Sequence, residues 1–78
     1  MGPTQKAVLR RLAARDDKRG TVSDLALESG IPVPVVHAGL AHLVAGGQVE
    51  RSESGSVKYI AYTLTPLGER MAEELGEG

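Results

Sequence analysis

The chain has 78 residues, with nine lysines and arginines against ten aspartates and glutamates, so its formal net charge is −1. It contains no cysteine, which excludes disulfides and thiolate metal sites, and no stretch has the length and hydropathy of a membrane span or a signal peptide. A hydrophobic fraction of 41%, with two tyrosines but no phenylalanine or tryptophan, indicates one small cytoplasmic domain over residues 1–78 with an aliphatic core.

The spacing of apolar residues predicts a first helix from Thr4, which can cap it, to about Arg15. Its buried stripe consists of Val8, Leu9, Leu12 and Ala13. The charged segment 16–20 ends this helix. Thr21-Val22 can then add a short strand to the edge of a later hairpin.

A second helix is predicted to begin at Ser23, because a serine hydroxyl can accept a backbone N–H at a helix N-terminus. Asp24 suits the positive end of the helix dipole, and residues 25–27 (Leu-Ala-Leu) are expected to face inward. Gly30 lies where the chain leaves the helix in a left-handed conformation, so Gly30-Ile31-Pro32 predicts a tight turn.

A third helix is predicted over residues 34–45, because Pro34 suits a first helical position and Gly46-Gly47 ends the pattern. Its inner stripe consists of Val36, Leu40, Leu43 and Val44. Its outer face consists of Pro34, Ala38, Ala41, His42 and Ala45, flanked by Val35 and His37. This outer face is small, smooth and uncharged.

Two strands follow, at residues 49–52 and 57–64, around a polar tip at residues 53–56. Ile60, Tyr62 and Leu64 share the face that is expected to pack on the helices. Thr65-Pro66 caps a last helix from residue 66 to about 75, in which Leu67, Met71 and Leu75 recur every four residues. Residues 76–78 are expected to fray.

This order of elements is the layout of a winged helix-turn-helix, so we expect an α+β, mainly α fold with a three-helix core, a β-hairpin wing and a short C-terminal helix. Residues 43–51 (LVAGGQVER) and 62–68 (YTLTPLG) resemble the junctions of winged-helix bacterial transcription regulators, most closely those of the MarR and PadR groups. The frequent alanine, glycine, arginine and valine residues are typical of a GC-rich bacterial or phage genome.

The resemblance implies a transcription regulator that binds double-stranded DNA in a sequence-specific way. Helix 34–45 would enter the major groove, and the wing at 52–58 would touch the DNA backbone or the minor groove. The residues that would contact DNA are Arg19, Thr21, Ser23, Pro34, Val35, His37, Ala38, His42, Arg51, Ser54, Ser56 and Lys58.

The chain departs from the pattern of these regulators, because no lysine or arginine occurs from Gly20 to Glu50. Recognition of guanine by a bidentate arginine is therefore excluded on the third helix. Sequence recognition by this helix would then rely on DNA shape, on methyl contacts from Val35 and Ala38, and on hydrogen bonds from His37 and His42. Both histidines can equally be solvated. The alternative is a protein–protein interaction module that uses the uncharged outer face of helix 34–45.

Basic residues are concentrated at the N-terminus, where residues 1–20 carry a net charge of +4 against −5 for residues 21–78. Arg10, Arg11 and Arg15 can contact phosphate or form a solvated face. The long dimerisation helices of MarR proteins are missing, so a homodimer would use residues 4–15 and 66–75. The two histidines, five residues apart, do not form a metal site, and we expect no cofactor and no enzymatic activity, since no catalytic constellation is present.

Overall fold

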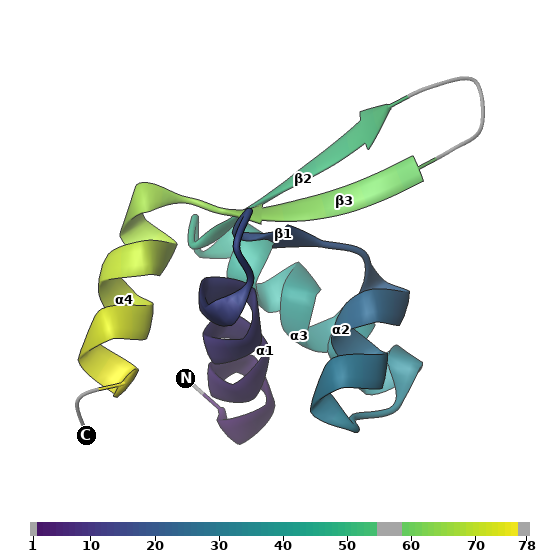
Figure 1. Ribbon diagram of the computed structural model, residues 1–78, viewed down its shortest axis with the longest axis horizontal. Coiled ribbons are helices and arrows are strands. Elements are labelled where there is room, and N and C mark those ends of the chain that lie inside the picture. Colours follow the sequence, from purple (N-terminus) through teal and green to yellow (C-terminus); the bar gives the residue numbers. More distant parts are fainter. Residues whose placement is uncertain (1, 55–58, 77–78) are drawn as a thin grey trace.

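The computed structural model describes residues 2–54 and 59–76 and has the predicted α+β, mainly helical winged-helix architecture (Figure 1). The elements in chain order are α1 (Pro3–Ala14), β1 (Arg19–Gly20), α2 (Val22–Ser29), α3 (Val33–Ala45), β2 (Val49–Ser54), β3 (Tyr59–Leu64) and α4 (Pro66–Gly76). Helix α4 lies beside α1, and the β2–β3 hairpin extends past the helices toward the side of α2.

The core lies where α1, α2 and α3 meet under the sheet. Its fully or almost fully buried side chains are Val8, Leu9, Leu12, Leu25, Val36, Leu40 and Leu43. This set confirms the predicted inner stripes of the first and third helices except at Ala13 and Val44, which are partly buried against it. Each fully buried leucine or valine contributes about 1.5–3 kcal/mol to the free energy of unfolding, so the core fixes the orientation of α3.

The three-stranded antiparallel sheet has the order β1-β3-β2. Strand β2 pairs with β3 from Val49 opposite Leu64 to Ser54 opposite Tyr59. Tyr62 and Leu64 are buried and Ile60 is partly buried against the core, as the alternation predicted. Strand β2 is longer than the predicted 49–52, because Glu53 and Ser54 belong to it rather than to the tip of the hairpin. At the start of the predicted strand 57–64, Val57 and Lys58 lie outside the described residues.

Three predictions for the N-terminal half were wrong in position. Helix α1 begins at Pro3 with Gly2 as its N-cap, since proline suits the first helical turn, and Thr4 lies inside the helix. The edge strand is Arg19–Gly20, two residues earlier than Thr21-Val22. Thr21, rather than Ser23, caps α2, because its Oγ1 accepts the Asp24 N–H at 3.1 Å.

The turn between α2 and α3 forms as predicted, with Gly30 in the left-handed region at φ 72°. Helix α3 starts at Val33, one residue before the predicted Pro34. Leu27 was predicted to face inward but is 85% exposed, because α2 buries only Leu25 and Ala26.

Helix α4 buries its small residues rather than a full leucine stripe. Gly68 and Ala72 face the core, whereas Leu67 is 42% exposed. A Cβ on Gly68 would overlap the backbone oxygen of Gln48, so this glycine allows α4 to pack against the connection between α3 and β2. Gly76 is the last residue of α4 rather than part of a frayed end, and residues 77–78 lie outside the described residues.

No single helix among the described residues has both the length and the hydropathy to cross a membrane. Helices α2 and α3 pass that test only as a pair, by length and composition, and they are bent by 116° at the turn that joins them.

Candidate nucleic-acid interface

Helix α3 has one buried face and one exposed face along its whole length. Val36, Leu40 and Leu43 are at most 1% exposed. All of the residues predicted for the outer face and its flanks are exposed, namely Pro34, Val35, His37, Ala38, Ala41, His42 and Ala45. No side chain of the helix carries a formal charge apart from any protonated histidine. The prediction of a smooth, uncharged outer surface is therefore confirmed.

A shallow, mainly apolar groove of about 230 Å³ runs between α3 and the first turn of α1. Its α3 side is formed by Val35, Ala38, Gly39 and His42, and its α1 side by Gly2, Pro3, Thr4 and Gln5. Gly39 is buried, and a Cβ at that position would lie 3.4 Å from the Thr4 Cγ2 atom. That distance is an ordinary van der Waals contact, so the first turn of α1 lies beside α3 at this point. The pattern of apolar residues within each helix did not reveal this contact.

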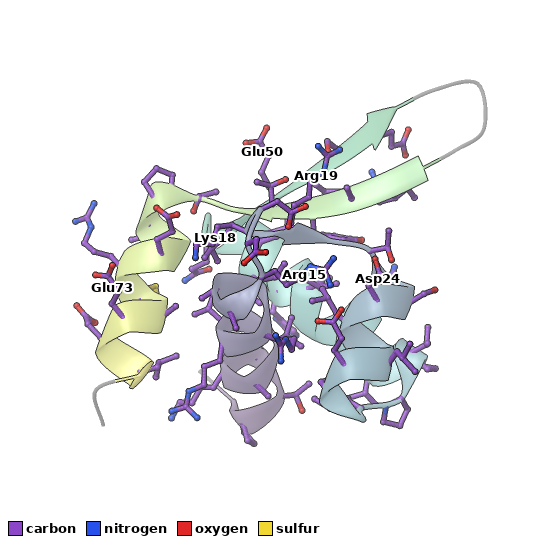
Figure 2. All side chains as sticks on the ribbon, in the orientation of Figure 1. Arg15, Lys18, Arg19, Asp24, Glu50 and Glu73 are labelled. Carbon is purple, nitrogen blue, oxygen red and sulfur yellow. The ribbon has the colours of Figure 1, made fainter. Side chains whose placement is uncertain are left out.

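The three residues around the start of α2 that were predicted to contact DNA do not lie together on one surface. The Thr21 hydroxyl is engaged as the α2 cap, and Ser23 is exposed in the first turn of that helix. Arg19 lies opposite Thr63, which in turn lies opposite Glu50, so these three residues share one face of the sheet. Figure 2 shows Arg19 and Glu50 on the side of the sheet that faces away from the helices. Arg19 therefore projects from the sheet and not from the helix-turn-helix.

In the wing, Arg51 is the predicted contact whose side chain is described. It lies opposite Tyr62 on the helix-facing side of the sheet and donates a hydrogen bond to Glu53 Oε1 at 2.9 Å. That hydrogen bond raises the pKa of Arg51, and Tyr62 acts in the same direction. Ser54 ends β2, and Ser56 and Lys58 lie outside the described residues.

The basic residues of the N-terminal segment are mostly engaged within the domain. Arg15 lies between α1 and α2 (Figure 2), where it donates to Glu28 and, at 2.6 Å, to the backbone oxygen of Arg19. The hydrogen bond to Glu28 raises the pKa of Arg15, and the carboxylates of Asp24 and Asp17, each 3.9 Å away, favour its charged form. The Arg15 guanidinium is therefore a bridge between elements.

Three further cations make similar intramolecular contacts. Arg11 Nε lies 3.2 Å from Glu28 Oε1, so Arg11 of α1 and Arg15, the C-cap of that helix, share one carboxylate of α2. Arg10 donates to the Leu75 backbone oxygen at 2.9 Å, and Lys18 donates to the Ala13 backbone oxygen at 2.7 Å. Both lysine and arginine are favourable near the carbonyl end of a helix. Within the described residues, by contrast, the Arg19 side chain makes no hydrogen bond or ion pair.

Metal ligation finds no support in the part of the chain that the structure describes, where no three His, Asp or Glu side chains are grouped to hold an ion. His37 and His42 are both exposed on α3. They are available for hydrogen bonds to a partner from the outer face of the helix.

Comparisons with known proteins agree with this geometry. Residues 7–53, which extend from α1 into β2, match the profile of the IclR helix-turn-helix domain. Two solved structures are similar over 99% of the chain at 28% identity: NadR in complex with 4-hydroxyphenylacetate (TM-score 0.80) and the zinc-dependent MarR family transcriptional regulator AdcR in its Zn(II)-bound state (TM-score 0.73). The chain spans about half of each, 54% and 51% respectively. A comparison with curated protein sequences gave no significant match. The predicted resemblance to winged-helix transcription regulators is confirmed.

Proposed function

The chain belongs to the IclR helix-turn-helix domain family, a DNA-binding domain of transcription regulators, and we propose that it reads a specific duplex sequence with α3 in the major groove. The observation that carries this proposal is the exposure of α3 along its whole outer face while its inner face is fixed by the core. A major groove about 12 Å wide admits one α-helix. Position in the groove is then set by the backbone contacts of the rest of the domain.

We propose that few cations contact the DNA backbone. Arg51 and Lys58 would hold phosphates from the wing, together with Ser54 and Ser56, and Arg19 would add a contact from the sheet. Ser23, exposed in the first turn of α2 at the positive end of the helix dipole, suits a further phosphate. With so few charges, roughly three to five phosphates would be neutralised per monomer, and the dependence of affinity on salt would be shallow.

The working unit is proposed to be a homodimer that binds a two-fold site, since one small module rarely gains enough specificity alone. Residues 4–15 and 66–75 would form the interface. The exposed Leu67 supports this assignment because it offers apolar surface on α4. We also propose a cytoplasmic location and no catalytic activity, in keeping with the regulators to which the chain is similar.

A second candidate function follows from the missing charge on α3. The centres of protein–protein interfaces are depleted of charged residues, and Pro34, Ala38, Ala41 and Ala45 would allow close packing of a partner helix. Under this alternative the domain docks on another protein through the same face, and duplex DNA is not its ligand.

The decisive experiment measures fluorescence anisotropy of the whole chain with a pool of random duplexes, beginning at low salt and repeated as salt is raised. We expect micromolar or tighter binding that falls linearly on a log–log plot. Absence of binding at the lowest salt would contradict the DNA proposal, and a pull-down with the same protein would then test the alternative.

A double substitution tests the wing. Arg51→Ala with Lys58→Ala should weaken binding to all sequences alike and reduce the salt slope by about two. The control is Arg10→Ala with Arg70→Ala, which removes the same charge from exposed positions on α1 and α4. Because both residues lie in the segments proposed for the homodimer, and Arg10 also donates to the Leu75 backbone oxygen, the oligomeric state and melting temperature of this control are measured beside its affinity. If the wing variant binds as tightly as the control variant, the wing does not contact phosphate.

A further inference from the structure

The groove between α3 and α1 is continuous with the outer face that is proposed to enter the major groove. Val35, Ala38 and His42 belong to both, because each is exposed on α3 and each lines the groove. Val35 and Ala38 are one turn apart, as are Ala38 and His42, so the three side chains form one row along the helix. A base edge that meets this row would therefore lie next to the first turn of α1.

The chemistry of the row limits which base edges it can recognise. Guanine and adenine present hydrogen-bonding atoms that are read best by arginine, asparagine or glutamine, and α3 has none of these residues. Thymine presents a C5-methyl group beside its O4 acceptor in the major groove. An aliphatic row with one imidazole beside it complements that pair of groups.

We propose that this groove is a receptor for the C5-methyl group of thymine, so that the domain selects its binding sites by thymine methyls rather than by purine hydrogen bonds. Val35 and Ala38 would contact the methyl group from α3, with Pro3 and Thr4 at the edge of the groove on its α1 side. The buried Gly39 forms the floor, beside Thr4 of α1. His42 would donate to the adjacent O4 atom.

The uncharged character of the groove selects this occupant over phosphate. A phosphate oxygen needs N–H or cationic partners, and the groove is mainly apolar. Recognition of a methyl group by aliphatic side chains needs no charge, since it depends on the removal of apolar surface from water. The inference rests on the proposed function, because it requires α3 to lie in the major groove.

The test uses duplexes that the protein has itself selected from the random pool. The selected duplexes are amplified once with dTTP and once with dUTP, which removes every thymine methyl and leaves the base pairing unchanged. We expect wild-type protein to bind the uracil duplexes about fourfold more weakly for each thymine methyl that the groove would otherwise hold. Equal affinity for the two preparations would overturn the proposal.

Two substitutions locate the effect on one side of α3. Val35→Ala should reduce the difference between thymine and uracil duplexes. Val33→Ala is the matched control, because Val33 is 49% exposed against 42% for Val35 but lines a separate groove at the α2–α3 turn. We expect Val33→Ala to leave the difference unchanged. If both variants reduce it equally, the groove is not the receptor.

A third duplex preparation distinguishes the contribution of the thymine methyl group from that of the O4 atom. Replacement of contacted T·A pairs with 5-methylcytosine·G pairs keeps the methyl group but replaces the O4 acceptor with an amino donor. Wild type should bind these duplexes between the thymine and uracil forms, and His42→Ala should bind the thymine and 5-methylcytosine forms alike. A His42→Ala variant that still prefers thymine would remove His42 from the site. Failure to bind any duplex would overturn the proposed function itself, whereas binding without methyl preference would overturn only this inference.

Discussion

The N-terminal basic segment and the outer face of α3 differ in how their side chains are engaged. In the basic segment, Arg11 and Arg15 share the carboxylate of Glu28, and Arg10 and Lys18 satisfy backbone oxygens near helix ends. On α3, the side chains of the outer face are exposed and uncharged. The charged region thus connects elements to one another, and the uncharged region is available to a partner.

A count of charges along a sequence therefore does not measure the charge that DNA meets. The net charge of +4 over residues 1–20 suggests a phosphate-binding segment, yet four of its six cations are held by intramolecular contacts. Each contact offsets part of the attraction that the cation could offer to phosphate. Substitutions of the cations that make these contacts should therefore change stability, and substitutions on α3 should change binding.

The largest expected effect comes from a charge on the outer face of α3. Ala41→Glu should reduce affinity for duplex DNA on the order of a hundredfold, because a carboxylate in the groove would face phosphates at a cost of several kcal/mol. The melting temperature should stay the same, since Ala41 is exposed. Anisotropy and circular dichroism measure the two effects.

Leu27→Glu is the matched control for that prediction. It adds the same charge at an 85% exposed position on α2, outside the proposed DNA contacts and dimer segments. We expect its affinity for DNA to stay close to wild type. An equal loss in both variants would show that binding follows net charge, and the contrast between the two regions would then be wrong.

The next effect concerns Thr21, which the sequence assigned to DNA and the structure places at the α2 cap. Thr21→Ala should lower the free energy of unfolding by about 1 kcal/mol, which corresponds to a melting temperature about 4–8 °C lower in a domain of this size. Thr21→Ser keeps the hydroxyl that accepts the Asp24 N–H and should restore most of the stability. If the alanine variant melts like wild type but binds DNA less tightly, the hydroxyl contacts DNA instead.

The error at Thr21 illustrates what local sequence patterns could and could not predict. The turn at Gly30, the inner stripe around Leu40 and the alternation in β3 follow from backbone geometry and periodicity, so the fold was predictable. Thr21 and Ser23 are both good caps, and the choice between them depends on where β1 ends, which is set by pairing with residues more than forty positions away.

The candidate site was predictable only in part for the same reason. The outer face of α3 follows from helical periodicity, and its exposure is confirmed. The groove beside it depends on contact between Gly39 and Thr4, and the partners of Arg11 and Arg15 depend on how α1 crosses α2. Such contacts between elements are not encoded by spacing within either element.

A smaller effect is expected where α1 and α2 share a carboxylate. Glu28→Gln should lower the free energy of unfolding by about 0.5–1 kcal/mol, because it removes ion pairs that are partly exposed. Affinity for DNA at low salt should not fall, since two arginines are released. Glu74→Gln is the control, because it makes the same charge change at an exposed position on α4 and should leave stability unchanged. If both variants melt alike, the shared carboxylate does not hold the helices together.

The smallest effect separates two arginines four residues apart. Arg19→Ala should weaken DNA binding roughly two- to fivefold, as expected for one exposed ionic contact, and lower the salt slope by about one. Its melting temperature should not change, because no hydrogen bond or ion pair of its side chain lies within the described residues.

Arg15→Ala should affect stability rather than DNA binding, since Arg15 bridges α1 to α2 through Glu28 and to β1 through the Arg19 backbone. It should lower the melting temperature and leave the salt slope of the folded protein intact. Salt titrations and thermal melts of both variants decide the matter: equal slopes for Arg15→Ala and Arg19→Ala would mean that the basic segment binds DNA as a whole.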